Sequence, residues 1–116
     1  LTLNGTPITI VAAPGAGKYI EVVSASSSLT FVSAAYATNT TVQLICESAT
    51  IAQLQDTAIL LSTVTKNTRF KDVTSAAAGE TQIITNSPLQ VKVATGNPAT
   101  GDSILKIKVV YRIVTI

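Results

Sequence analysis

The segment Ala13-Pro-Gly-Ala-Gly-Lys18 follows an apolar stretch and is the part of the chain most similar to a phosphate-binding loop. That loop needs a glycine five residues before Gly17 and a hydroxyl residue directly after the lysine. Alanine and tyrosine occupy these two positions. We expect a strand after Lys18, so no helix N-terminus would be present to hold a phosphate. The segment therefore predicts a β-turn in place of a nucleotide site.

The side chains that most often carry out catalysis are missing or dispersed. The sequence contains no histidine, which removes the commonest general base and the commonest metal ligand. Ser–His–Asp and Cys–His nucleophiles are excluded for the same reason. The six acidic residues form no D-x-D cluster of the calcium-binding type. We expect no catalytic residue, cofactor or metal; two distant carboxylates acting on a glycoside are the remaining enzymatic alternative.

Cys46 is the one cysteine of the chain, so an internal disulfide cannot form. It alternates with Val42 and Leu44, two apolar residues of an expected strand. This spacing predicts a thiol buried in the core.

Three residues of expected loops are candidates for surface contacts, namely Tyr36, Phe70 and Asn97. Exposed aromatic rings with nearby polar groups are typical of sites that recognise sugars. The alternative for both rings is that each anchors its own loop.

Composition predicts one β domain spanning residues 1–116. Charged residues make up 12% of the chain, against about 25% in an average domain, while Val, Ile, Ser and Thr are abundant. The net charge of +2 is scattered, so we expect no nucleic-acid partner. No apolar run is long enough to span a membrane and no signal peptide is evident. Because Leu1 is too bulky for routine removal of a preceding Met, we expect a trimmed or partial product.

Strands are expected at 6–12, 18–28, 41–47, 58–64, 79–86 and 89–95, separated by Gly, Pro and Asn turns. Residues 51–55 are ambiguous between a strand and a helical turn, and 66–79 is expected as the longest loop. With the closing strand, seven or eight short strands predict a two-sheet antiparallel β-sandwich. A jelly roll is the favoured version, and an immunoglobulin-like sandwich is second.

The closing strand, 103–116, has the clearest pattern in the chain. Apolar residues alternate with basic residues over its length. We expect the apolar set to fill the core, namely Leu105, Ile107, Val109, Tyr111 and Ile113. We expect Lys106, Lys108 and Arg112 to face solvent or another subunit, and Ile116 to contact another chain.

Three segments resemble small bacteriophage virion proteins: Pro7–Val23, which contains the glycine-rich turn, Ser33–Thr40, and Ile107–Ile113 with its Tyr-Arg-Ile ending. The resemblance implies a β-sandwich subunit on the virion surface, such as a capsid decoration protein or a head-fibre knob. It implies a homo-oligomer, with a trimer favoured, that contacts virion proteins such as the major capsid protein. It carries over no functional residue. The alternative function is a glycan- or receptor-binding module of a phage fibre or tail.

Overall fold

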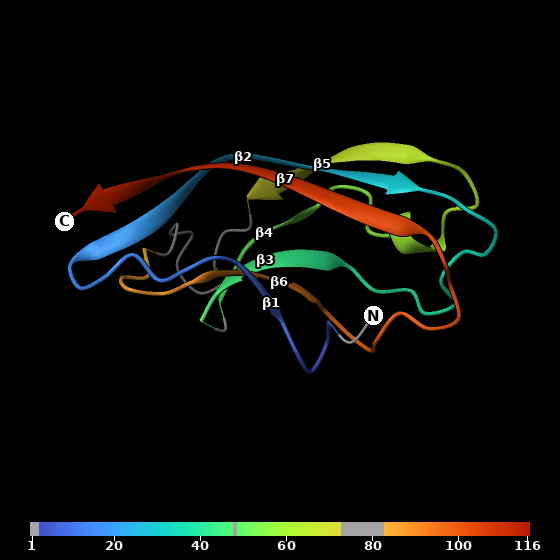
Figure 1. Cartoon of the computed structure of the whole chain (residues 1–116), viewed down its shortest axis with the longest axis horizontal. Helices are drawn as coiled ribbons and strands as arrows, with labels where there is room; N and C mark the ends of the chain where they lie inside the picture. The colour runs from blue at the N-terminus through green and yellow to red at the C-terminus, as the bar shows by residue number, and fades with distance from the viewer. Residues whose placement is uncertain (1–2, 48, 73–82) are drawn as a thin grey trace.

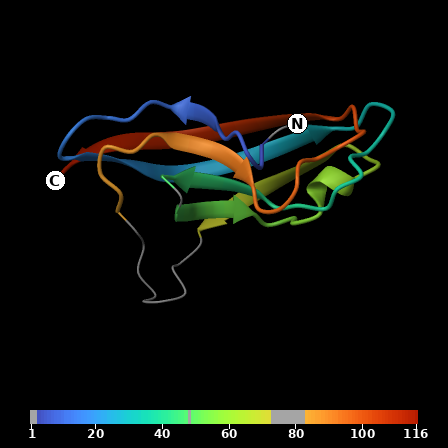
Figure 2. The same cartoon turned by 90° about the horizontal axis from the view of Figure 1, so that it is seen from below.

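The computed structural model describes residues 3–47, 49–72 and 83–116 as one antiparallel sheet curled into a half-barrel (Figure 1, Figure 2). Its seven strands lie in the order β1-β6-β3-β4-β5-β2-β7. Their bounds are β1 Ile8–Val11, β2 Lys18–Thr30, β3 Val42–Cys46, β4 Ala49–Leu54, β5 Lys66–Asp72, β6 Leu89–Val93 and β7 Ile104–Thr115. A short 3-10 helix, η1 Ile59–Leu61, lies between β4 and β5.

The expected all-β antiparallel architecture is confirmed, but the strands do not form two facing sheets. One strand, β5, joins the two halves, because it pairs with β4 through Phe70 and with β2 through Arg69. The result is one continuous curved sheet in place of the expected sandwich or jelly roll.

The core lies on the concave side of the sheet. Fully buried side chains come from four of the strands and from η1, and they include Leu29, Leu44, Leu54, Ile59, Leu60 and Leu89. Burying apolar surface of this kind is the main favourable term in folding. The alternation of β2, β3 and β6 therefore decides which face of each strand turns inward.

The longest ladder joins β2 and β7, from Lys18↔Thr115 to Thr30↔Ile104. The register shifts between Val22 and Ser24. Two residues of β2 therefore stand opposite one of β7, as in a β-bulge. The extra residue is Val23, which is exposed, and the inward alternation resumes at the buried Ala25.

Several expected elements differ in the structure. Residues 58–64 contain η1 and no strand. Of the loop expected at 66–79, residues 66–72 form β5, and residues 73–79 lie outside the described residues. The ambiguous residues 51–55 belong to a strand, β4. Of the strand expected at 79–86, residues 79–82 lie outside the described residues, and the remainder contributes the isolated bridge Tyr19↔Thr85.

The closing strand is confirmed as β7, with one correction to its expected core. Leu105, Ile107 and Val109 are half-buried and pack against the core. Tyr111 and Ile113 are 43% and 52% exposed, although they lie on the same face. The reason is that β5 pairs with β2 only from Ser26 to Leu29. The first half of β2 and the second half of β7, which pair with each other, therefore extend beyond β5.

Candidate functional site

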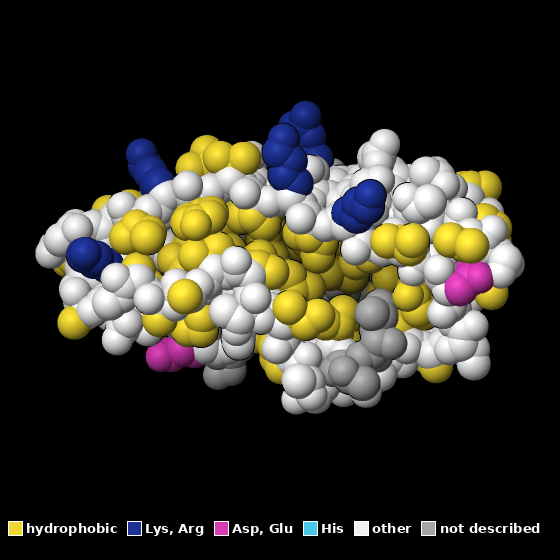
Figure 3. Space-filling model, in the orientation of Figure 1, with side chains coloured by type: hydrophobic (Ala, Val, Ile, Leu, Met, Phe, Trp, Pro, Cys, Tyr) yellow, Lys and Arg dark blue, Asp and Glu magenta, His cyan; other side chains and the backbone are white. Residues whose placement is uncertain are grey.

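An apolar groove opens on the concave side, between the two edge strands of the half-barrel. Its volume is about 440 Å³. Ile8 and Ile10 of β1 line one wall, and Ile104, Leu105 and Ile107 of β7 line the other. Figure 3 shows the hollow, with hydrophobic side chains gathered inside it. Ile8 and Ile104 are each more than half exposed, so apolar surface faces solvent here.

The groove exists because the sheet does not close on itself. The strand order places β1 and β7 at opposite ends, and within the described part of the chain no ladder joins them. Every neighbouring pair in the order is antiparallel, so β1 and β7 run in the same direction. Direct closure would need a parallel ladder, and β1 offers only four residues to it.

Tyr36 forms part of the base of the groove and is not a surface ring. It is 8% exposed, and its hydroxyl donates a 2.8 Å hydrogen bond to the backbone carbonyl of Ser103. Its backbone N–H donates to the carbonyl of Leu60 at 3.1 Å. Burial, with the nearby charge of Asp102, raises the pKa of the phenol. Tyr36 therefore anchors its loop, which corrects the expected surface contact.

The other two candidate surface residues lie elsewhere. Phe70 belongs to β5, not to a loop, and is half-buried against the core. Asn97 is exposed, and its side-chain oxygen accepts a 2.8 Å hydrogen bond from the N–H of Asn4. It therefore ties two loops together.

A carboxylate holds the loop of Tyr36 from its other side. Asp102 accepts hydrogen bonds from the N–H groups of Ser33 and Ala34, at 3.0 and 2.8 Å, and from the Ser33 hydroxyl. These hydrogen bonds, led by that from the hydroxyl, lower the pKa of Asp102. This carboxylate is therefore a structural cap for the loop.

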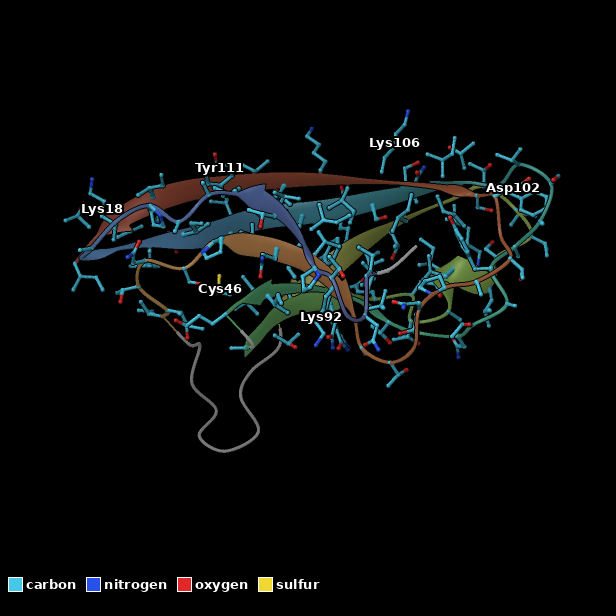
Figure 4. All side chains as sticks on the ribbon, turned by 60° about the horizontal axis from the view of Figure 1, so that its bottom comes forward. Lys18, Cys46, Lys92, Asp102, Lys106 and Tyr111 are labelled. Carbon is cyan, nitrogen blue, oxygen red and sulfur yellow. The ribbon has the colours of Figure 1, made fainter. Side chains whose placement is uncertain are left out.

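The basic residues of β7 lie on the convex side and are exposed, as expected. Figure 4 shows Lys106 pointing away from the sheet. Lys106 and Lys108 stand opposite Ser28 and Ser26 of β2. Arg112 forms an ion pair with Glu21, and its hydrogen bond lowers the pKa of that carboxyl. Ile116 is 74% exposed.

The remaining candidates for chemistry are the thiol of Cys46 and the side chains that could ligate a metal. Cys46 is buried, and this burial raises the pKa of its thiol. No group of three potential metal-ligating side chains lies together in the described ranges. In the same ranges, no helix is long and apolar enough to cross a membrane.

The sequence predicted the strands of both walls, at 6–12 and 103–116, but not the open groove between them. The signal for the β1 wall is the alternation Ile8-Thr9-Ile10, which places both isoleucines on one face of a short strand. Nothing in the pattern shows that this face stays uncovered.

The chain matches no family model, no curated protein and no solved structure. Its geometry is therefore the basis for a functional proposal.

Proposed function

We propose that this chain is a non-enzymatic structural subunit that oligomerises and attaches to a phage capsid. The observation that carries the proposal is the open side of the half-barrel, where two strand edges and apolar side chains such as Ile8 and Ile104 face solvent. An unpaired edge is a template for pairing with another chain, and exposed apolar patches are typical of interaction sites. The virion setting comes from the resemblance of the sequence to phage structural proteins.

Three of the six carboxylates are engaged in structural contacts, which favours this proposal. Asp102 caps a loop, Glu21 pairs with Arg112, and Asp56 pairs with Lys66 at 3.3 Å. Buried Cys46 is a poor nucleophile, because its raised pKa keeps the thiol protonated.

The alternative, a glycan-binding module, receives less support from the same residues. It rested on Tyr36, Phe70 and Asn97. The two rings are buried and half-buried, and Asn97 alone is exposed among the three. No observation favours it over an assembly role.

The virion setting is tested by mass spectrometry of purified particles of the phage that encodes the chain. We expect the chain in the particles, at hundreds of copies for a head-shell position or a handful for a vertex or tail position. A particle without the chain would overturn the virion assignment.

The attachment is tested by mixing the purified protein with capsids that lack it and pelleting the capsids. We expect the protein to pellet with the capsids and to be oligomeric by light scattering. A stable monomer that stays in the supernatant would contradict the proposal.

A further inference from the structure

The first half of β2 and the second half of β7 form a two-stranded arm, which we define as residues 18–25 paired with residues 109–115. Within the described residues, the outer edge of β7 has no strand partner along its whole length. A row of backbone N–H and C=O groups is therefore free to pair there.

The arm carries apolar side chains that the chain itself does not cover. Tyr111 and Ile113 face the concave side at 43% and 52% exposure, and Val110 on the convex side is also exposed. Ile20 and Val22 stand opposite Ile113 and Tyr111 on β2, so the inward apolar face continues along the arm. A surface of this kind is expected to be covered in the working assembly.

We propose that a second copy of this chain covers it, by antiparallel pairing of the two β7 strands about a two-fold axis at Tyr111. A two-fold contact is isologous, so the same strand serves both partners. Two β7 strands related in this way run antiparallel, as do all other neighbours in the sheet. The inward faces of both copies lie on the same side of the joined sheet only if odd-numbered residues stand opposite odd-numbered residues, and even-numbered opposite even-numbered.

The charges of β7 select the register. Four two-fold registers meet this condition and pair at least eight residues of each β7. They are centred on residues 108, 109, 110 and 111. A centre at 108 places Lys108 opposite itself, and a centre at 109 places Lys106 opposite Arg112 of the second copy. A centre at 110 places Lys108 opposite Arg112. Like charges directly opposite one another destabilise a ladder.

Only the register centred on Tyr111 avoids every such pair. It places Lys108 opposite Val114 and Arg112 opposite Val110 of the second copy. On the inward face, Tyr111 stands opposite itself and Val109 stands opposite Ile113. Aromatic and β-branched pairs of this kind stabilise neighbouring strands. The exposed apolar residues of the arm are therefore self-complementary, which is why we assign the partner as a second copy.

The inference deepens the oligomeric part of the proposed function and does not depend on the virion setting. It predicts a two-fold contact, whereas the resemblance favoured a trimer. Because the test uses the isolated protein, its failure leaves particle incorporation standing, and absence from particles leaves the pairing standing.

The first test is sedimentation equilibrium of the full chain. We expect a reversible species of twice the 12.0 kDa chain mass. A monomer at all accessible concentrations, or a trimer, would overturn the proposal.

The second test reads the register by disulfide trapping, in a Cys46→Ala background that removes the native thiol. Opposite residues of an antiparallel pair have Cα atoms about 4.5–5.5 Å apart, within the range that a disulfide spans. We expect Tyr111→Cys to cross-link to itself rapidly under a mild oxidant, and Val109→Cys to cross-link with Ile113→Cys in a mixture. In this register the two copies of residue 109 are about 13 Å apart along the strand, so Val109→Cys alone should cross-link slowly.

Two positions report competing registers without altering the charges of β7, since Val109→Cys and Val110→Cys would each cross-link to itself about its own centre. Faster self-cross-linking at either of these than at Tyr111→Cys would refute the assigned register.

A charge variant separates pairing from folding. Tyr111→Lys places two lysines opposite one another and should weaken dimerisation about tenfold or more. The matched control is Val64→Lys, at an exposed valine between η1 and β5, which should leave the dimer intact. Both variants should keep the circular dichroism spectrum of the parent, because both side chains are substantially exposed. Equal dimerisation of Tyr111→Lys and the parent would contradict the proposal.

Discussion

Gly101 lies against the buried Tyr36, and replacing it by alanine should destabilise the fold strongly. A Cβ at this position would lie 2.6 Å from both the backbone N and the Cδ1 atom of Tyr36. Carbon atoms in contact normally stay about 3.5–4.0 Å apart. Neither neighbour moves freely, because the N–H of Tyr36 is bound to Leu60 and its hydroxyl to Ser103.

The size of the effect follows from these contacts. Overpacking of a core costs about 1–3 kcal/mol, and relieving the overlap would lose a buried hydrogen bond of Tyr36, at about 1 kcal/mol. We therefore expect Gly101→Ala to lower the free energy of unfolding by roughly 2–4 kcal/mol. At about 4 °C per kcal/mol for a domain of this size, the Tm should fall by roughly 8–16 °C.

Differential scanning calorimetry of Gly101→Ala and Gly5→Ala measures this effect with a matched control. A Cβ at Gly5 would have nothing within 4 Å, so that variant should stay within about 0.5 kcal/mol of the parent. If Gly101→Ala melted within about 3 °C of the parent, the described packing of Tyr36 against this glycine would be wrong.

Three further predictions concern buried or capping polar groups. The Ser27 hydroxyl is buried without a hydrogen-bond partner in the described structure, so Ser27→Ala should raise the free energy of unfolding in urea by about 1 kcal/mol; a loss of stability would show that the hydroxyl has a partner. The pKa of Asp102 is lowered in the folded state, so its contribution is present above the ordinary carboxyl pKa of about 3.9 and is lost as the pH falls through the lowered value. Asp102→Asn should therefore reduce Tm at pH 7 more than at pH 3, and an equal reduction at both would contradict the cap. Because Cys46 is buried with a raised pKa, Ellman's reagent at pH 8 should label it only in denaturant; rapid labelling of the native protein would refute its burial.

The strands with strong alternation could be predicted from the sequence. Residues 18–28, 41–47 and 89–95 correspond to β2, β3 and β6, because the inward-facing side chains of a strand recur every second residue. The run 58–64 could not be assigned in this way, since a short apolar run has the same appearance in a strand and in a buried turn. The structure buries Ile59 and Leu60 on η1.

The elements missed by sequence reasoning depend on partners far away in the chain. β5 is polar, and it is a strand because β4 and β2 pair with it on both sides. Tyr36 is an anchor because its hydroxyl reaches a carbonyl 67 residues away. For Tyr111 and Ile113 the pattern predicted the correct face, but whether that face is covered depends on where β5 ends.

The same long-range pairing explains why the half-barrel presents an interaction surface. An antiparallel sheet of seven strands has edge strands that run in the same direction, so β1 and β7 could join only through a parallel ladder. With four residues in β1 and twelve in β7, most of the longer edge would stay unpaired even then. An antiparallel neighbour for β7 must therefore be an eighth strand. A two-fold copy supplies one with the correct direction, and the cations of β7 leave it one long register, centred on Tyr111. The odd number of strands among the described residues and the spacing of Lys106, Lys108 and Arg112 therefore leave the open edge one specific contact.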